Sequence, residues 1–371
     1  MADARDFNDQ RVEMADVGDA DAVNFPEIGV ALVSGPAFAE RAMRAQEAGT
    51  ADGPLETIEP EYFVFSDGAP ADYLRGFLRA TQAIAGDLGG AAFDELMQDE
   101  VDAQVLGVTW GLKACRVPPS TRSGAGIRVA VLDTGMDLGH PDFAGRVVVG
   151  QSFVGQPVQD LHSHGTHCIG TACGPLAPPG ATPRYGIAHK AQIYVGKVLT
   201  NSGSGTSASV LAGMNWAIAN QCAVISMSLG SQSPVQAAYT AAGRAALNKG
   251  CLIVAAAGNA AAATGAPANS PTIFSVASLD PTLVPSSFSN FGKVEIAAPG
   301  RDVFSSVPRP TRYGTKSGTS MATPHVAGVA ALWAQTAATM RGIVLWNRLL
   351  ASARPLPFVP TRVGRGLVQA P

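Results

Sequence analysis

The stretch from Gly318 to Gly328, GTSMATPHVAG, contains Ser320 within a turn of small residues, and an apolar run follows it. Because the run is apolar on nearly all sides, it predicts a buried helix beginning close to Ser320. The first N–H groups of a helix lack partners within it and its dipole favours negative charge, so an alkoxide could form there and attack a carbonyl. Pro324 agrees with a first helical turn, which needs no N–H from it. The alternative is a capped core helix with an incidental serine.

Two further candidates stand at predicted strand or helix ends, where sites of open α/β sheets collect. Asp133 directly follows an apolar run, and its alternative interpretation is a turn-capping residue. Asp137 and Asp142 are nearby alternatives to it. His164 lies in HSHGTHCIG, which is expected to open another helix. The order aspartate, histidine, serine is one of the known arrangements of the Ser-His-Asp machinery, in which the histidine activates the serine.

Three histidines within six residues, His162, His164 and His167, raise the possibility of a metal site. The His-x-His spacing is not accompanied by the acid or cysteine partners that zinc needs, so we expect no zinc there. The five cysteines form an odd, sparse set without metal-ligand spacing, which favours a reduced, intracellular setting.

Positioning these residues requires a parallel sheet. Apolar runs without alternation are separated by helical stretches, which predicts an α/β fold with a mostly parallel central sheet and helices on both faces. The expected strands are 127–132, 193–199, 223–227, 252–257 and 273–277, and the expected helices between them are 207–220 and 235–249.

The chain of 371 residues has room for about two domains. We expect a flexible tail over 1–24, a small α+β domain and linker over 25–104, and a catalytic domain over 105–371. The α+β unit would hold strands at 28–33 and 55–65 and helices at 36–48 and 70–88.

Composition excludes some functions. The net charge of −3 gives no sign of the excess positive charge that binding to nucleic acid or an anionic membrane favours. No apolar run approaches the length of a membrane span. The polar, acidic N-terminus lacks the layout of a secretory signal, which predicts a cytoplasmic protein, or a secreted one if a leader has been lost from the sequence.

Three blocks of this chain, DTG at 133–135, HGTH at 164–167 and GTSMATPH at 318–325, resemble the signature blocks of the subtilisin family of serine endopeptidases. The resemblance covers about residue 110 to the C-terminus. It implies that Ser320 is the nucleophile, His164 its general base and acid, and Asp133 the partner that orients the imidazole. Asn259 matches the family's side-chain oxyanion donor, and its alternative interpretation is a turn residue after Gly258.

The resemblance also implies a groove for an extended peptide, which would add as a strand between two edge segments. The segments are Gly203, Ser204, Gly205 and Ser228, Leu229, Gly230; Ala256, Gly258 and Gly265 match the first side-chain pocket. None of these pocket residues is charged, so we expect a preference for apolar residues before the scissile bond. Ser207 stands where the family often has a bulky residue, which predicts an open fourth subsite.

The family implies two further features. Asp142 matches a calcium ligand, but the loop 174–184 lacks the other side-chain ligands expected, so structural calcium is possible and no cofactor is required for the chemistry. Cys168 matches a free cysteine beside the catalytic histidine in one branch, which predicts inactivation by mercurials; the alternative is a small buried apolar residue.

The N-terminal unit resembles the family's propeptide, which implies a zymogen whose N-terminal domain inhibits its own groove until cleavage between about residues 65 and 104. Protein or peptide substrates are the expected partners. Two alternatives stay open: a processing protease for one partner protein, with a retained N-terminal recognition domain, and a non-catalytic peptide-binding module.

Overall fold

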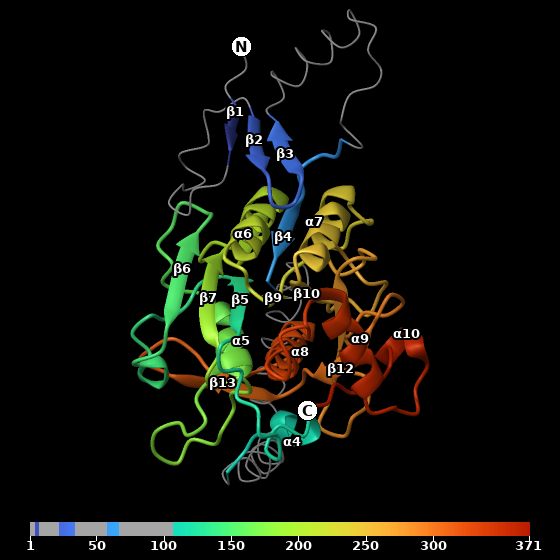
Figure 1. Ribbon diagram of the computed structural model, residues 1–371. Coiled ribbons are helices and arrows are strands. Elements are labelled where there is room, and N and C mark those ends of the chain that lie inside the picture. The colour runs from blue at the N-terminus through green and yellow to red at the C-terminus, as the bar shows by residue number, and fades with distance from the viewer. Residues whose placement is uncertain (1–3, 7–21, 34–57, 67–106) are drawn as a thin grey trace, which may run out of the picture.

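The computed structural model describes residues 4–6, 22–33, 58–66 and 107–371 (Figure 1). Its centre is a seven-stranded sheet in the order β12-β11-β10-β9-β5-β7-β6, and every ladder in it is parallel. The strands are β5 (Arg128–Asp133), β6 (Val148–Ser152), β7 (Gln192–Lys197), β9 (Val224–Met227), β10 (Leu252–Ala256), β11 (Phe274–Leu279) and β12 (Ile296–Pro299). The predicted parallel α/β fold is confirmed.

The five strands expected from apolar runs all form, with ends that differ from the expected ones by at most three residues. The sheet continues beyond them to β6 at one edge and β12 at the other. β6 is only partly buried and contains Gly150, while β12 is short and ends at Pro299. Neither carries the long β-branched run that marks a buried strand, which explains why the sequence did not reveal them.

Alternate residues of β5 enter two different cores. Val129 and Val131 pack with α5 (His164–Cys173) and α8 (Thr319–Ala334), whereas Ala130 and Leu132 pack with α6 (Ser207–Ala219) and α7 (Ala237–Asn248). Figure 1 shows α6 and α7 on the side of the sheet nearer the N-terminal strands and α5 and α8 on the other side. A strand covered on both faces must be apolar on both, which accounts for the runs without alternation.

Helix α8 is the buried helix predicted from the apolar run. Every residue from Thr319 to Leu332 is buried, and Ser320 is the second residue of the helix. The placement of Pro324 in the first turn is wrong, because it is the sixth residue of α8. Its missing N–H would otherwise bond the carbonyl of Ser320, four residues earlier, so that carbonyl needs another donor.

The N-terminal region contributes a three-stranded sheet in the order β1-β2-β3. β1 (Ala4–Asp6) pairs parallel with β2 (Ala22–Phe25), and β3 (Val30–Val33) pairs antiparallel with β2. The strands β1 and most of β2 therefore fall where the sequence predicted a flexible tail. The strand predicted over 28–33 forms as β3 over its last four residues, after a turn at 26–29. The boundaries between domains stay predictions.

This N-terminal sheet rests on the catalytic region. Val23, Phe25 and Ile28 share the core of α6 and α7, and the backbone N–H of Glu27 donates to Asn215 Oδ1 at 2.8 Å. The Glu27 carboxylate also pairs with Lys249. The predicted helices at 36–48 and 70–88 lie outside the described residues.

The remaining elements surround the sheet. They are α4 (Trp110–Ala114), η2 (Pro141–Phe143), β4 (Phe63–Phe65), β8 (Ser204–Thr206), β13 (Val303–Ser306), β14 (Tyr313–Lys316), α9 (Gly342–Ser352) and α10 (Pro360–Val363). In the described part of the chain, no helix combines the length and apolarity needed to cross a membrane.

Helix α8 makes stability depend on pH through His325. Its ring is buried, with Nδ1 2.9 Å from the Met321 carbonyl, and burial lowers its pKa to about 4. Because the unfolded chain takes up a proton near pH 6.5 and the folded chain does not, stability is full above pH 6.5 and is lost as pH falls toward 4. We expect roughly 2 kcal/mol of this loss by pH 5.

The measurement is denaturant unfolding at pH 7 and pH 5 in a Ser320→Ala background, which prevents self-digestion. His325→Asn keeps an N–H near the Met321 carbonyl but cannot be protonated, so its stability should fall less between these pH values. An equal loss in both proteins would contradict this role of His325.

Candidate active site

Asp133 and His164 form a buried pair at the carboxyl end of β5. His164 Nδ1 lies 2.8 Å from Asp133 Oδ1 and 3.0 Å from Oδ2, and each side chain is only 1 % exposed. Burial raises the pKa of Asp133, but the charge and hydrogen bond of His164 outweigh it and the pKa lies below its ordinary value. Burial lowers the pKa of His164, yet Asp133 holds it well above 6.5. The Asp133 carboxylate therefore stabilises positive charge on the His164 ring whenever the ring takes up a proton.

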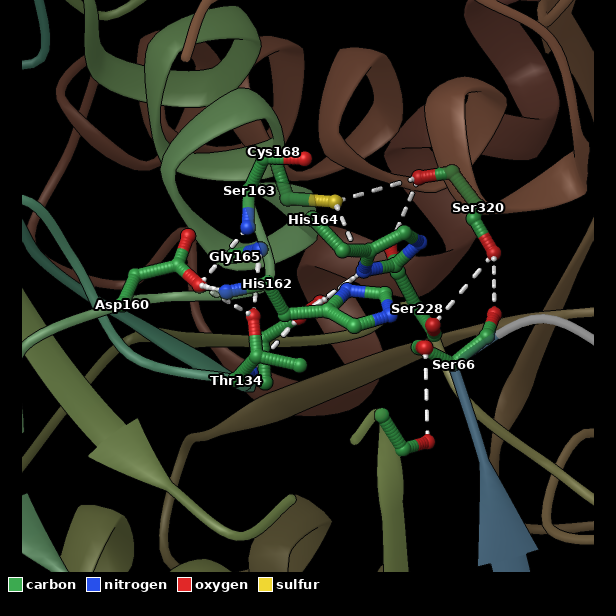
Figure 2. Close-up of polar contacts among 12 residues, drawn as sticks. Ser66, Thr134, Asp160, His162, Ser163, His164, Gly165, Cys168, Ser228 and Ser320 are labelled. Carbon is green, nitrogen blue, oxygen red and sulfur yellow. Dashed lines mark hydrogen bonds and ion pairs between the residues drawn. The ribbon is translucent and has the colours of Figure 1, made fainter. Parts of the chain in front are cut away.

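Ser320 lies next to this pair but does not hydrogen-bond to it. Its Oγ donates to the carbonyl of Ser66 at 3.1 Å, with the Ser228 carbonyl at 3.3 Å. Among the described residues, His164 Nε2 has no hydrogen-bond partner. Figure 2 shows the Ser320 hydroxyl turned toward Ser66 and Ser228, beside the His164 ring. Rotation of one side-chain bond would redirect this hydroxyl.

The Ser320 carbonyl is held by groups outside its helix. Ser228 Oγ donates to it at 2.7 Å and Cys168 Sγ at 3.6 Å. These donors replace the helical N–H that Pro324 lacks. Since Cys168 Sγ also lies 3.9 Å from His164 Nδ1, it contacts both the Ser320 backbone and the His164 ring. The proline thus ties the start of α8 to α5 and to the strand end at Ser228.

Asn259 presents its amide to the same place. Its Oδ1 accepts from the Thr319 N–H at 2.8 Å and from Thr319 Oγ1 at 2.9 Å. Both donors fix the carbonyl end toward α8, which leaves the Nδ2 group for another acceptor. Nδ2 lies 3.2 Å from where a Cβ on Gly318 would stand, so it borders the turn that leads into Ser320. The role of Asn259 as an oxyanion donor stays a prediction.

Asp160 is a candidate positioning residue that the sequence did not reveal. Its Oδ1 accepts from the N–H groups of His162 and Ser163 at 2.9 Å each and from Thr134 Oγ1 at 3.0 Å. Its Oδ2 accepts from the N–H of Thr166 at 2.9 Å and from its Oγ1 at 2.7 Å. The completely buried carboxylate therefore joins the end of β5 to the start of α5, and so sets Asp133 against His164.

The same carboxylate stabilises an unusual turn. Ser163, immediately before His164, has a left-handed backbone with φ of 82°, which costs a non-glycine residue free energy. The hydrogen bond to Asp160 contributes to offsetting that cost. The only signal in the sequence was an acid four residues ahead of a predicted helix start, a pattern common at ordinary helix ends.

A segment of the N-terminal region lies in the predicted groove. β4 pairs antiparallel with β8, with Val64 opposite Gly205 and Phe65 opposite Ser204. On the other side, Phe65 and Gly230 exchange two backbone hydrogen bonds of 3.0 and 2.9 Å. The Ser66 N–H donates to the Gly203 carbonyl at 2.9 Å. Both predicted edge segments are thus paired with this chain's own residues.

The predicted pocket residues sit at the end of β10 and in the loop after it. Ala256 is buried, Gly258 follows it with φ of 110°, and the Gly265 N–H donates to the Ala257 carbonyl at 3.2 Å. Leu229, between the two groove-forming residues, is buried in the core of α6 and α7. The preference of this pocket for apolar side chains stays a prediction.

The residues around Asp142 do not fit a calcium site. Its two carboxylate oxygens accept hydrogen bonds from the Tyr185 hydroxyl at 2.5 Å and the Tyr313 hydroxyl at 2.9 Å. Calcium prefers six to eight oxygen ligands, and here two hydroxyl donors occupy the oxygens that would bind it.

The clustered histidines His164 and His167 face different partners and not a common point where a metal could bind. His164 faces Asp133, whereas His167 Nε2 bonds the Val303 carbonyl at 2.9 Å. Asp133, His164 and Cys168 do have ligand atoms within 4.8 Å of one another. However, burial raises the pKa of the Cys168 thiol, so it stays protonated and is a poor ligand for zinc.

A serine at the start of a buried helix, a histidine paired with a buried aspartate, and a peptide groove on a parallel sheet together define a serine hydrolase that binds extended chains. Residues 124–366 match the Subtilase family, so this chain belongs to that family and is a serine endopeptidase. This confirms the resemblance read from the sequence.

Several curated relatives agree with this assignment. The chain is 39% identical to M-protease of Shouchella clausii over 278 residues, which cover 73% of this chain and 71% of that protein. It is 45% identical to thermitase of Thermoactinomyces vulgaris over 218 residues, 57% of this chain and 76% of that protein. It is 39% identical to subtilisin Savinase of Lederbergia lenta over 270 residues, 71% of this chain and 97% of that protein.

Replacement of Asp160 should impair catalysis without removing any reacting group. Asp160→Asn keeps one acceptor oxygen but cannot accept all five hydrogen bonds, so the His164 ring should shift relative to Ser320. We expect kcat to fall by up to about 100-fold with KM little changed. Steady-state kinetics on a chromogenic peptide would measure this.

The matched control is Asp137→Asn. The Asp137 carboxylate is also buried, but it accepts from Arg309 Nε and Nη2 at 2.9 Å each and from Gln159 Nε2 at 3.2 Å, and not from the residues 162–166 that Asp160 holds. This variant should lose stability and keep kcat within about twofold. Equal losses of kcat in both variants would refute a specific positioning role for Asp160.

Cys168 should make the enzyme sensitive to mercurials. A mercury atom bound to Sγ would displace the thiol from the Ser320 carbonyl and crowd the His164 ring. We expect slow inactivation of the wild type, because the thiol is buried, and resistance of an active Cys168→Ala variant. Residual activity after timed incubation is the readout; equal sensitivity of the variant would place the mercury at another of the cysteines.

Proposed function

We propose that this endopeptidase uses Ser320, His164 and Asp133 as a catalytic triad. The Ser320 hydroxyl attacks the substrate carbonyl carbon as its proton passes to His164 Nε2, and Asp133 stabilises the resulting imidazolium. The developing oxyanion accepts hydrogen bonds from Asn259 Nδ2 and the Ser320 N–H. The amine then leaves with the proton from His164. Water attacks the acyl carbon as its proton passes to His164 Nε2, and the Ser320 oxygen leaves and takes up that proton. The buried Asp133–His164 pair is the observation that carries this proposal.

We further propose that the protein is made as a zymogen. The strand from Phe63 to Phe65 fills the groove, and the Ser66 carbonyl accepts from the Ser320 hydroxyl. A substrate would need the same backbone positions on Gly203, Gly205 and Gly230, so an attached N-terminal region competes with every substrate. This supports inhibition by the N-terminal domain and a first cut soon after Ser66.

Two finer points are also proposals. The uncharged pocket around Ala256, Gly258 and Gly265 supports a preference for apolar residues before the scissile bond. The five unpaired, buried cysteines support a cytoplasmic location, since disulfides are rare in reducing compartments.

The test is an intact-mass measurement after incubation of the purified full-length chain. The wild type should lose mass by a cut in the first bonds after Ser66, while casein hydrolysis increases in parallel. Ser320→Ala should keep its full mass. Cleavage in the variant, or no labelling of Ser320 by a sulfonyl fluoride, would overturn the proposal.

A further inference from the structure

The start of helix α7 holds a carboxylate from the segment in the groove. Glu59 Oε1 accepts from the Ala237 N–H at 2.7 Å and Oε2 accepts from the Ala238 N–H at 3.1 Å. These are the first two residues of a twelve-residue helix. Glu59 stands seven residues before Ser66, whose carbonyl contacts the nucleophile. The contact therefore lies at the far end of the same bound segment.

Helix α7 lacks a cap of its own. The side chain of Gln236, at the N-cap position, makes no capping hydrogen bond, and the first turn contains no acidic residue. Most helices satisfy these first N–H groups with a nearby serine, threonine, aspartate or asparagine. Here the acceptor is a carboxylate that arrives from 178 residues away in the sequence, and the helix dipole favours its negative charge.

The path between this carboxylate and the nucleophile is continuously bound. The Ser207 N–H donates to the Tyr62 carbonyl at 2.7 Å, and Ser207 Oγ accepts from the Tyr62 N–H at 3.1 Å. The ladder of β4 on β8 then continues to Phe65. Pro60 keeps the preceding Glu59 extended. Any peptide paired in this register places its residue at the Glu59 position over the start of α7.

We propose that the start of α7 is a distal subsite that selects substrates with an acidic side chain seven positions before the residue at the Ser66 position. The proposal rests on the proposed peptidase function and adds a substrate class to it. The ligand is a carboxylate, and the site consists of the backbone N–H groups of Ala237 and Ala238. A substrate would reach this site by pairing with Ser207 as Tyr62 does. Once the N-terminal segment leaves, the same amides are open to a substrate side chain.

Hydrogen exchange tests the carboxylate contact without catalysis. In the full-length Ser320→Ala chain, the Ala237 and Ala238 amides have no partner within the helix, so their protection reports on Glu59. Glu59→Gln should accelerate their exchange about five- to tenfold, because a neutral amide binds helix N–H groups more weakly than a carboxylate does. Glu61→Gln is the matched control, because Glu61 is exposed and the Ala237 and Ala238 amides donate to Glu59 instead, so it should leave this exchange unchanged.

Peptide kinetics test the use of the site on substrates. The substrate is a fluorogenic peptide with the sequence of residues 57–70, TIEPEYFVFSDGAP, given to the full-length protein after its casein activity has become constant. Replacing the first glutamate by glutamine should raise KM about five- to tenfold with kcat unchanged. Replacing the second glutamate, which leaves the same net charge, should change KM less than twofold. High salt should reduce the difference.

A protein variant removes the subsite itself. Ala237→Pro deletes the closer N–H, and proline is tolerated at the first position of a helix. The preceding Gln236 already has φ of −104° and ψ of 131°, the extended backbone that a residue before proline needs. This variant should hydrolyse the parent peptide and the peptide that lacks the first glutamate with nearly equal KM.

The outcomes separate the two proposals. Equal KM for the three peptides with the wild type, or unchanged discrimination by Ala237→Pro, would overturn the distal subsite while leaving the peptidase intact. Casein hydrolysis without any cleavage of the parent peptide would also overturn it. No hydrolysis of casein or peptide would overturn the proposed catalytic function, and the exchange experiment would still decide whether α7 binds the carboxylate.

Discussion

The contact between Asp133 and His164 is the constraint on which the rest of the site depends. Two ionisable groups are buried at the end of a parallel sheet, where a lone charge would be strongly destabilising. Each tolerates burial only because the other is within hydrogen-bond distance. The surroundings are accordingly built to prevent separation: Asp160 holds the end of β5 and the beginning of α5 with one carboxylate, and helices close both faces of the sheet.

The second organising feature is the helix that carries Ser320. A proline at its sixth position would normally weaken a helix, and here it releases a carbonyl that Ser228 and Cys168 can reach. The hydrogen bond lost within α8 is thereby exchanged for contacts to two other elements. The loss of one hydrogen bond weakens α8 locally. In exchange, the two new contacts fix Ser320 relative to α5 and to the groove, which a regular helix would not do.

Sequence reasoning identified most of this architecture because buried parallel strands are apolar on both sides. The run before Asp133 and the helix that contains Ser320 could be located from their unbroken apolar runs, whereas the roles predicted for Asp133, His164 and Ser320 came from their order and from the resemblance of three short blocks to a known family. The interpretation of Pro324 was wrong, because the sequence pattern does not show at which residue a helix begins. The edge strands β6 and β12 were missed because β6 is only partly buried and β12 is short.

Other features depend on contacts between residues far apart in the chain. Asp160 accepts mostly from residues two to six positions further along, which an ordinary acid before a helix also does, and only the bond from Thr134, 26 residues earlier, joins two elements. Tyr185 and Tyr313, whose hydroxyls donate to Asp142, lie 43 and 171 residues from it, and Glu59 lies 178 residues from Ala237. Hydrogen bonds between such distant residues leave no local pattern, so a single sequence does not reveal them.

The strand in the groove belongs to the same polypeptide as the groove. A tethered ligand acts at an effective concentration that short, flexible connections can bring to the millimolar range. Its occupancy is therefore insensitive to how much protein is present. Once the connection is broken, the identical contacts become those of two separate molecules, and dilution begins to favour release. One severed bond would thus convert a unimolecular equilibrium into a bimolecular one, without altering a single contact at the interface.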